Sequence, residues 1–326
     1  MALNVAVTRV IPDRGLDLLR DKCDPLEINQ EDRVLTRDEL LDIVKGRDGV
    51  LCLLTDPIDA AVFDAAGPQC KIFANYAVGY NNIDVDAATQ RGIAITNTPG
   101  VLTDATADHA WALLFSVARR IVEADRFTRQ GKFKGWGPML FLGGDITGRT
   151  LGVVGAGRIG TAMALKSAGF KMKVLYTDTT GNEALEKKLG AERVDLETLL
   201  KSSDYVTVHV PLLPKTIHLI GEKELGMMKP SAYLINTSRG PVVDEKALVE
   251  ALREKRIAGA GLDVFEDEPE LAPGLADLDN VVIPPHIASA TIETRGKMAE
   301  MAATNLIDRL EGRKPPNCVN LEVLKS

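Results

Sequence analysis

Residues that could do chemistry gather in the last third of the chain. His286, in VVIPPHIAS, follows an apolar run and precedes a long amphipathic stretch, and histidine is the side chain that exchanges a proton most readily near neutral pH. This position indicates a proton donor or acceptor at a junction between domains, although a loop histidine bonded to backbone would fit the same pattern. Of the other three histidines, we expect His109 to pack within a helix, His209 to end a strand near a cofactor, and His218 to lie at the surface.

Two further segments carry groups that could act with His286. Arg239 follows the apolar run ending at Asn236, so it should lie at the carboxyl edge of a sheet, where a guanidinium can grip a substrate carboxylate with two hydrogen bonds. The segment GLDVFEDEP, residues 261–269, ends another strand in a cluster of acids. One of these carboxylates beside His286 would orient the imidazole and favour its protonated form. Spacing alone does not decide which acid this is, or whether the loop is simply solvated.

A glycine motif, LGVVGAGRIG at 151–160, indicates a dinucleotide site. Gly155 would permit a tight turn, Gly157 would let the pyrophosphate approach the backbone, and Gly160 would let helix and strand pack closely. The helix that starts at this motif offers N–H groups to phosphates. The next strand ends in Asp178, which can bind both ribose hydroxyls and would repel a 2′-phosphate, while residues 179–182 contain no Arg or Lys. We therefore predict NAD(H) rather than NADP(H).

Short apolar runs alternate with amphipathic stretches along the whole chain, which predicts an α/β fold with parallel sheets. Before the glycine motif we expect strands at 3–7, 49–54, 71–75 and 92–96, and helices at 15–21, 37–44 and 103–121. From the motif onward we expect strands at 151–154, 173–178, 205–210, 232–236, 257–262 and 281–283, and a last helix at 290–310.

The last helix has nothing of its own domain left to build, so it should return to pack on the first domain. We therefore predict a Rossmann dinucleotide-binding domain, residues 101–287, inserted into a flavodoxin-like substrate domain formed by residues 1–100 and 288–326. The active site should then lie in the cleft between the two domains.

Composition excludes several classes of protein. The net charge of −7 and the pI near 5.3 argue against nucleic acid as a partner. The four cysteines show no metal-binding or redox spacing, so we expect reduced packing residues and no bound metal. No apolar run is long enough to span a membrane, and the N-terminus lacks the features of a signal peptide. A cytoplasmic protein is the expectation.

Several ordered segments together resemble one family. They are GAGRIG (155–160), INTSRGPVVDEKAL (235–248), AGLDVFEDEP (260–269) and PPHIASA (284–290). The sequence is similar over essentially its whole length to the D-isomer-specific 2-hydroxyacid dehydrogenases. Within that family, NYAVGYNNIDV (75–85), ITNTPGVLTDATADHA (95–110) and RRIVEAD (119–125) resemble hydroxypyruvate and glyoxylate reductases.

The resemblance implies a catalytic set of Arg239, Glu268 and His286, of which Arg239 and His286 also bind the substrate. It implies that Arg239 and backbone N–H groups at Val78 and Gly79 hold the substrate carboxylate. It also implies contacts with the cofactor in addition to those of the glycine loop and Asp178, at Thr106, Arg158, Ile159, Val210, Pro211, Thr237, Asp263 and Ser289. Asp263 could instead be a structural acid at the end of its strand. Archaeal-type glyoxylate reductases carry Ser-Arg-Thr where this chain has Asp178-Thr179-Thr180, and tryptophan in place of Leu140.

The activity that the resemblance implies is NADH-dependent reduction of hydroxypyruvate to D-glycerate and of glyoxylate to glycolate. Phosphoglycerate, formate and phosphite dehydrogenases resemble the same family; the chain ends soon after its last helix, and Pro285 rather than Gln precedes His286, which disfavours the first two. A NAD-sensing binding protein like the family's transcriptional corepressors is the alternative outside catalysis. Family members pair through the region of residues 103–121, whose apolar character should exclude it from solvent, so we expect a homodimer.

Overall fold

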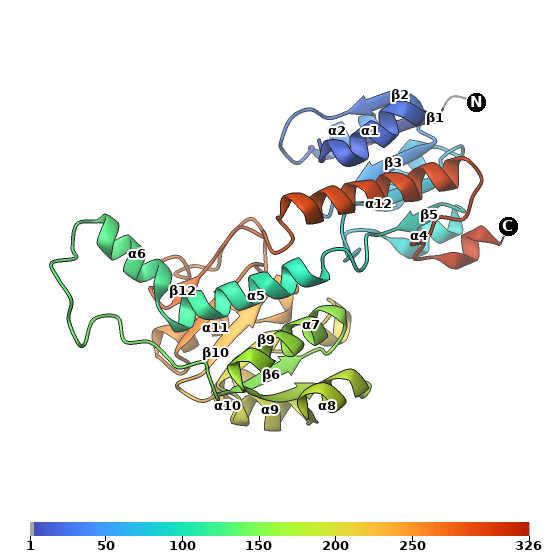
Figure 1. The fold of residues 1–326 in the computed structure, drawn as a ribbon. Coiled ribbons are helices and arrows are strands. Elements are labelled where there is room, and N and C mark those ends of the chain that lie inside the picture. The colour runs from blue at the N-terminus through green and yellow to red at the C-terminus, as the bar shows by residue number, and fades with distance from the viewer. Residues whose placement is uncertain (1–2, 326) are drawn as a thin grey trace. The chain divides into compact units, whose positions relative to one another are not determined.

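The computed structural model describes residues 3–325, and the chain divides into two compact units. The first unit holds residues 1–102 and 290–326, and the second holds residues 103–289. Each unit is built around its own all-parallel sheet with helices between the strands (Figure 1). This confirms the predicted α/β fold with two parallel sheets.

The sheet of the first unit has five strands in the order β2-β1-β3-β4-β5. This order is the flavodoxin-like arrangement. The strands are β1 (Leu3–Val7), β2 (Cys23–Ile28), β3 (Gly49–Cys52), β4 (Ile72–Asn75) and β5 (Ala94–Thr96). The sequence did not predict β2, which contains Pro25; as an edge strand, it tolerates a residue that cannot donate to the ladder.

Helices cover this sheet, and the C-terminal helix is one of them. They are α1 (Asp13–Lys22), α2 (Arg37–Val44), α3 (Ala60–Ala66), α4 (Val85–Gln90) and α12 (Ile292–Leu310), followed by the short turn η4 (Leu321–Leu324). Helix α12 packs on α1 and on β3 and β4. Gly15 permits the close approach of α1 to α12, because a Cβ at this position would lie 2.5 Å from the carbonyl oxygen of Ala299.

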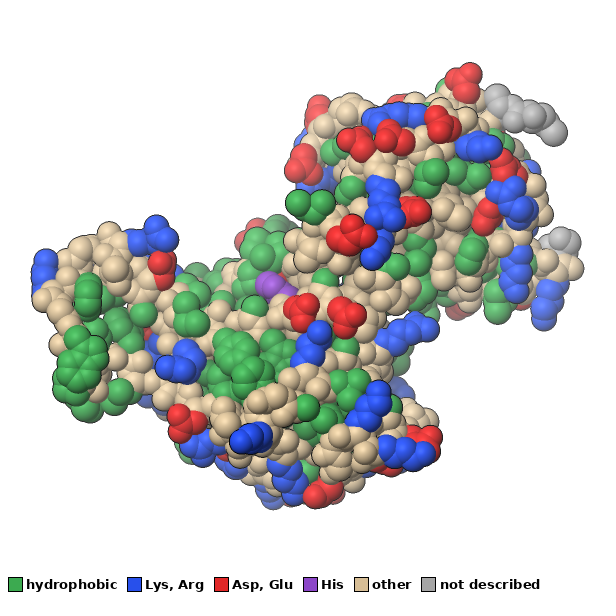
Figure 2. Space-filling model, in the orientation of Figure 1, with side chains coloured by type: hydrophobic (Ala, Val, Ile, Leu, Met, Phe, Trp, Pro, Cys, Tyr) green, Lys and Arg blue, Asp and Glu red, His purple; other side chains and the backbone are tan. Residues whose placement is uncertain are grey.

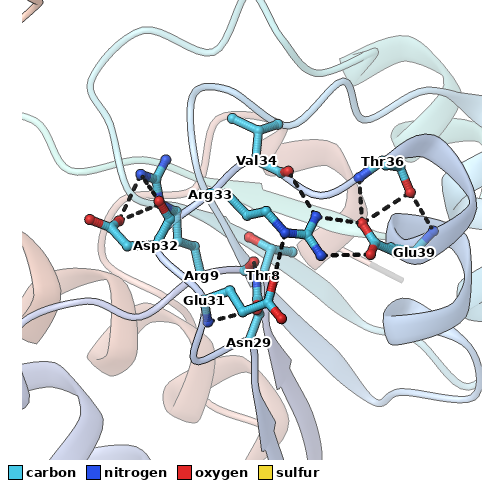
Figure 3. A network of polar contacts seen from close by, with 9 residues as sticks. All are labelled: Thr8, Arg9, Asn29, Glu31, Asp32, Arg33, Val34, Thr36 and Glu39. Carbon is cyan, nitrogen blue, oxygen red and sulfur yellow. Dashed lines mark hydrogen bonds and ion pairs between the residues drawn. The ribbon is translucent and has the colours of Figure 1, made fainter.

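A polar network ties the loop after β2 to its neighbours (Figure 3). The Arg33 guanidinium binds both carboxylate oxygens of Glu39 at 2.7 Å, and Glu39 closes a capping box with Thr36 at the start of α2. The same guanidinium lowers the pKa of Glu39 to about 2. At the other end of the loop, the Asn29 side chain donates to the carbonyl oxygen of Thr8, which follows β1. The loop is therefore fixed at both ends.

The sheet of the second unit has seven strands in the order β12-β11-β10-β9-β6-β7-β8. The strands are β6 (Thr150–Val154), β7 (Lys173–Thr177), β8 (Glu192–Arg193), β9 (Tyr205–Val208), β10 (Tyr233–Asn236), β11 (Gly259–Leu262) and β12 (Val281–Val282). Numbered within the unit, this is the Rossmann order 3-2-1-4-5-6 with a seventh strand added, and the order reverses between β6 and β9. The carboxyl ends of these two strands therefore flank the place where such sheets bind ligands.

Helices cover both faces of this sheet. They are α5 (Thr103–Ala118), α6 (Ile121–Arg129), α7 (Arg158–Lys166), α8 (Glu183–Leu189), α9 (Leu196–Ser202), α10 (Glu222–Met227) and α11 (Glu245–Arg253), with short turns η1 (Ser167–Phe170), η2 (Pro214–Thr216) and η3 (Gly240–Val242). Helix α5 packs closely on β11 at Gly261. A Cβ at this position would lie only 2.9 Å from Cβ of Leu113, so glycine permits the close approach. Among residues 3–325, no helix is both long and apolar enough to cross a lipid bilayer.

The sequence predicted one helix over 103–121 with an apolar outer face. This prediction is wrong about where the helix ends and about the character of that face. Helix α5 ends at Ala118, Arg120 has a left-handed φ of 54°, and α6 begins at Ile121. The returning backbone at Gly144 donates to the carbonyl oxygen of Ala118 and so ends the helix. The outward positions of α5 are Asp104, Asp108 and Ala112, and Lys166 pairs with both acids. This face is therefore polar, not apolar.

Candidate active site

The glycine loop joins β6 to α7 at the point where the strand order reverses. Gly155 has a φ of +92°, and a Cβ there would lie 2.8 Å from Cγ1 of Val210. A Cβ at Gly160 would lie 2.0 Å from the carbonyl oxygen of Gly155. The loop is therefore held tightly against the end of β9 on one side and against the start of α7 on the other, as a dinucleotide-binding turn requires.

The second glycine of the motif leaves an open approach to the backbone. Gly157 precedes the first helical residue of α7, and a Cβ at this position would meet no heavy atom within 4 Å. Arg158 and Ile159 form the first turn of α7. No side chain caps the N-terminus of α7, and the space over Gly157 is free. Both features suit a pyrophosphate, which binds the N–H groups at a helix N-terminus. The glycine loop and the start of α7 therefore fit the expected dinucleotide.

Asp178 lies where β7 ends and contacts the glycine loop. One carboxylate oxygen accepts the N–H of Ala156 at 2.7 Å, and the other accepts the N–H of Thr179 at 2.6 Å. Residues 179–182 contain no Arg or Lys, as noted from the sequence, but the structure brings an arginine to this acid from another strand. Arg193, at the end of β8, donates to the carbonyl oxygens of Asp178 and Thr179 at 2.8 and 2.9 Å. No pattern in the sequence signals this contact, because strand pairing brings Arg193 there from outside the loop.

Other expected cofactor residues lie at the same carboxyl edge of this sheet. Val210 and Pro211 follow β9, and Thr237 follows β10. The Thr237 hydroxyl is buried and has no hydrogen-bond partner within residues 3–325, so a polar group of a ligand could satisfy it. Thr106 is buried in the first turns of α5, and Ser289 is the last residue of this unit.

His286 and Glu268 are in direct contact. The imidazole Nδ1 lies 2.9 Å from a carboxylate oxygen of Glu268, and both side chains are partly exposed. The other carboxylate oxygen of Glu268 accepts the N–H of Phe265 at 3.0 Å. Burial raises the pKa of Glu268, but the hydrogen bond and the charge of His286 outweigh it, so this pKa lies below its ordinary value. Glu268 is therefore charged at neutral pH, and Nε2 is the ring nitrogen of His286 left for a ligand.

Arg239 reaches the same region through a close contact between backbones. A Cβ at Gly240 would lie 1.7 Å from the carbonyl oxygen of Phe265, so only glycine lets the segment after β10 lie against the segment after β11. Burial lowers the pKa of Arg239, and the charge of Glu268 raises it in part, which shows that the two charges interact. The guanidinium and the carboxylate thus share one site.

Asp263 anchors the loop that carries His286. Its carboxylate is fully buried, and its two oxygens accept the N–H groups of Ile287 and Ala288, both at 2.8 Å. His109 of α5 lies against the same carboxylate, with Nε2 3.1 Å from an oxygen but not aligned for a hydrogen bond. This geometry supports the structural alternative for Asp263, and each oxygen keeps a lone pair for a cofactor contact. His109 therefore contacts an acid, rather than only packing in its helix.

The remaining histidines have different surroundings. His209 follows β9, and its Nδ1 is buried without a partner in the described chain. Burial lowers the pKa of His209 to about 3, so this ring is neutral at physiological pH. His218 is at the surface, as expected, with Nε2 2.6 Å from Glu266. Within residues 3–325, no group of three or more His, Cys, Asp or Glu side chains could hold a metal ion.

Val78 and Gly79 belong to the first unit and follow β4. Their carbonyl oxygens accept side-chain hydrogen bonds, from Asn97 at 2.8 Å and from Asn75 at 2.9 Å. No partner for their N–H groups is present within the described residues. These N–H groups are therefore available to a ligand.

Comparison with known proteins places the chain in a family. The sequence profile of the D-isomer specific 2-hydroxyacid dehydrogenase NAD binding domain matches residues 111–288. The chain belongs to the D-isomer-specific 2-hydroxyacid dehydrogenase family. It is 55% identical over 328 aligned residues to glyoxylate reductase of Korarchaeum cryptofilum, covering 100% of this chain and 98% of the relative. It is 53% identical to glyoxylate reductase of Thermococcus litoralis, covering 100% of this chain and 99% of that protein.

Solved structures agree with this assignment to the 2-hydroxyacid dehydrogenases. A protein of Thermus thermophilus has a TM-score of 0.90 and 47% identity, with 97% of this chain and 99% of that chain covered. The NADPH-dependent glyoxylate/hydroxypyruvate reductase of Sinorhizobium meliloti has a TM-score of 0.85 and 33% identity, with 99% and 98% covered. The family confirms the predicted Rossmann domain, an oxidoreductase and a nicotinamide dinucleotide cofactor.

The open space over Gly157 generates a prediction for this dehydrogenase. Gly157→Ala should fold normally, because its Cβ meets no protein atom, yet it should weaken NADH binding by about tenfold or more, equivalent to about 1.4 kcal/mol. Gly169→Ala in η1 is the control, since its Cβ also meets nothing within 4 Å. Thermal unfolding and fluorescence titration with NADH measure both properties. Equal NADH affinity in the two variants would contradict this use of the loop.

Proposed function

We propose that this chain reduces small 2-oxo acids with NADH, taking hydroxypyruvate to D-glycerate and glyoxylate to glycolate. The observation that carries this proposal is the contact of His286 with the charged Glu268 in the site that also holds Arg239. Supporting it, the relatives from Korarchaeum cryptofilum and Thermococcus litoralis are glyoxylate reductases.

Each of the three side chains has one proposed role. Arg239 binds the substrate carboxylate with two parallel hydrogen bonds and so orients the neighbouring carbonyl. His286 holds a proton on Nε2 and donates it to the carbonyl oxygen, while Glu268 stabilises the imidazolium through Nδ1. His209 cannot serve as this acid, because its pKa of about 3 leaves it without the proton at neutral pH. The bound dinucleotide supplies the hydride.

For the other site residues we propose the roles that the sequence led us to expect. We propose that the first unit is the substrate domain, with the N–H groups of Val78 and Gly79 binding the substrate carboxylate. The proposed cofactor contacts are those of the second unit: Thr106, Gly155, Gly157, Arg158, Ile159, Gly160, Asp178, Val210, Pro211, Thr237, Asp263 and Ser289. The unpartnered Thr237 hydroxyl is the strongest support among these, apart from the glycine loop.

The proposed preference for NADH rests on Asp178, whose charge would repel a 2′-phosphate next to the glycine loop. NADPH is the alternative cofactor, favoured by two observations: Arg193 lies beside Asp178, and the Sinorhizobium meliloti relative is NADPH-dependent. Another D-2-hydroxyacid dehydrogenase activity, such as that of phosphoglycerate dehydrogenase, and a NAD-sensing binding role remain the rival functions.

A steady-state assay tests the activity and the cofactor choice together. With glyoxylate or hydroxypyruvate, kcat/KM for NADH should exceed that for NADPH by at least about tenfold, equivalent to about 1.4 kcal/mol in the transition state. A panel of 2-oxo acids including 3-phosphohydroxypyruvate separates the rival dehydrogenases. NADH binding without turnover of any panel member would favour the sensing role and refute the proposed reduction.

The pair of Glu268 with His286 predicts a signed pH effect. Glu268→Gln keeps a hydrogen-bonding group but removes the negative charge that stabilises the imidazolium. The alkaline limb of the kcat profile for reduction should therefore move to lower pH, because the imidazolium loses its proton sooner. Glu266→Gln is the matched control, since Glu266 contacts His218 instead. A limb that stays in place or moves upward in Glu268→Gln would exclude this pairing, provided that NADH still binds.

We propose that the chain is a homodimer that pairs through α6 and the loop after it, and not through the outer face of α5. This loop exposes several large apolar side chains to solvent (Figure 2): Phe133, Trp136, Met139, Leu140 and Leu142, of which Trp136 is 85% exposed. Helix α6 itself buries no residue and exposes Ile121 and Val122. A contiguous exposed apolar segment of this kind is typical of an interface.

Light scattering at micromolar concentration should therefore give the mass of a dimer. Trp136→Ser combined with Met139→Ser should shift the mass towards the monomer, because these side chains are the most exposed of the loop. Leu321→Ser, an exposed apolar residue of the first unit, should leave the dimer intact. A monomeric parent protein, or equal masses for both variants, would refute this interface.

We also propose a cytoplasmic location. All four cysteines are free thiols, and burial raises the pKa of Cys23 to about 11 and that of Cys70 to about 12, so these thiols stay protonated and unreactive.

A further inference from the structure

Arg193 is fixed beside the acid that ends β7. Its Nε and Nη2 donate to the carbonyl oxygen of Asp178 at 3.2 and 2.8 Å, and Nη2 also donates to the carbonyl oxygen of Thr179 at 2.9 Å. These bonds hold the guanidinium in one orientation at this loop, although the side chain is exposed. Its Nη1 has no partner within residues 3–325. The guanidinium is therefore anchored through Nε and Nη2, and Nη1 is open.

The neighbouring carboxylate is fixed as well. Asp178 accepts N–H groups from Ala156 on one oxygen and from Thr179 on the other, so its two oxygens are held by the backbone of the glycine loop and of the loop after β7. The Asp178 carboxylate and the Arg193 guanidinium are therefore both fixed at the loop that follows β7. A phosphate there would be repelled by the first and attracted by the second.

We propose that Arg193 is a binding residue for a 2′-phosphate, so that this chain retains measurable affinity for phosphorylated dinucleotides against the repulsion of Asp178. The inference rests on the proposed use of the glycine loop for a dinucleotide. A guanidinium suits this task because its planar N–H groups match phosphate oxygens, and the bonds to the main chain already hold it in place. Cofactor choice in this chain is then set by the balance between Asp178 and Arg193.

Adenosine 2′,5′-bisphosphate and 5′-AMP provide the direct test, because they differ only in the 2′-phosphate. In calorimetric titrations at low ionic strength, Arg193→Gln should weaken binding of the bisphosphate by about tenfold or more, the worth of a hydrogen bond to a charged group, and change 5′-AMP binding by less than about twofold. Arg193→Lys keeps the charge but loses the fork, so its loss should be intermediate. Lys188→Gln, on the exposed face of α8, is the control for general loss of positive charge and should change neither ligand.

The result of removing the repulsion completes the test. Asp178→Ser should increase affinity for the bisphosphate by about tenfold, and most of this gain should vanish when Arg193→Gln is added. An Arg193→Gln variant that binds both ligands as the parent does, or loses both equally, overturns the assignment, the second result meaning that Arg193 only fixes the loop. No binding of the bisphosphate to the parent chain overturns it too.

If the proposed preference for NADH were wrong, the results would differ from those that overturn the assignment of Arg193. In that case the parent protein would bind the bisphosphate more tightly than 5′-AMP and would turn over NADPH at least as well as NADH. The assignment of Arg193 depends only on the difference between parent and variants, so the two ideas are judged separately.

Discussion

The backbone of Gly240 lies directly against the carbonyl of Phe265, and the arrangement of the reactive side chains depends on this contact. Any side chain at Gly240 would force the segments after β10 and β11 apart. With them in contact, Arg239 and Glu268 are close enough for their charges to interact. Asp263, at the same strand end as Phe265, then holds the N–H groups of Ile287 and Ala288 and thereby fixes the loop that carries His286.

This arrangement gives both buried or half-buried carboxylates, Glu268 and Asp263, a backbone N–H donor. Glu268 pairs with His286 and accepts a hydrogen bond from the N–H of Phe265, so its pKa stays low in spite of burial. His209, which lies at the same edge of the sheet without a carboxylate partner, is instead held neutral by burial. The two histidines thus differ in their surroundings: His286 has a carboxylate partner, whereas burial keeps His209 neutral.

Sequence reasoning predicted most of the fold, because buried parallel strands and amphipathic helices leave clear patterns, as in the apolar strands β3, β4 and β9. It missed β2 and β8, which lie at the edges of their sheets and need no such pattern. It located the ends of the strands that bear Arg239, Glu268 and His286, but only the resemblance to a family singled out Glu268 among its neighbouring acids. Arg193 was invisible, because pairing of β8 with β7 rather than proximity in sequence brings it to Asp178. The break at Arg120 was missed because the backbone that ends α5 returns from Gly144.

The central claim is that His286 donates the proton to the substrate while Arg239 binds it, and the kinetics of His286→Ala test this most directly. With NADH and glyoxylate, kcat should fall by about 10² or more, the usual contribution of a positioned acid, while KM and the affinity for NADH stay nearly unchanged. A His286→Ala variant that binds NADH normally and keeps its kcat within a few-fold of the parent value would contradict the account.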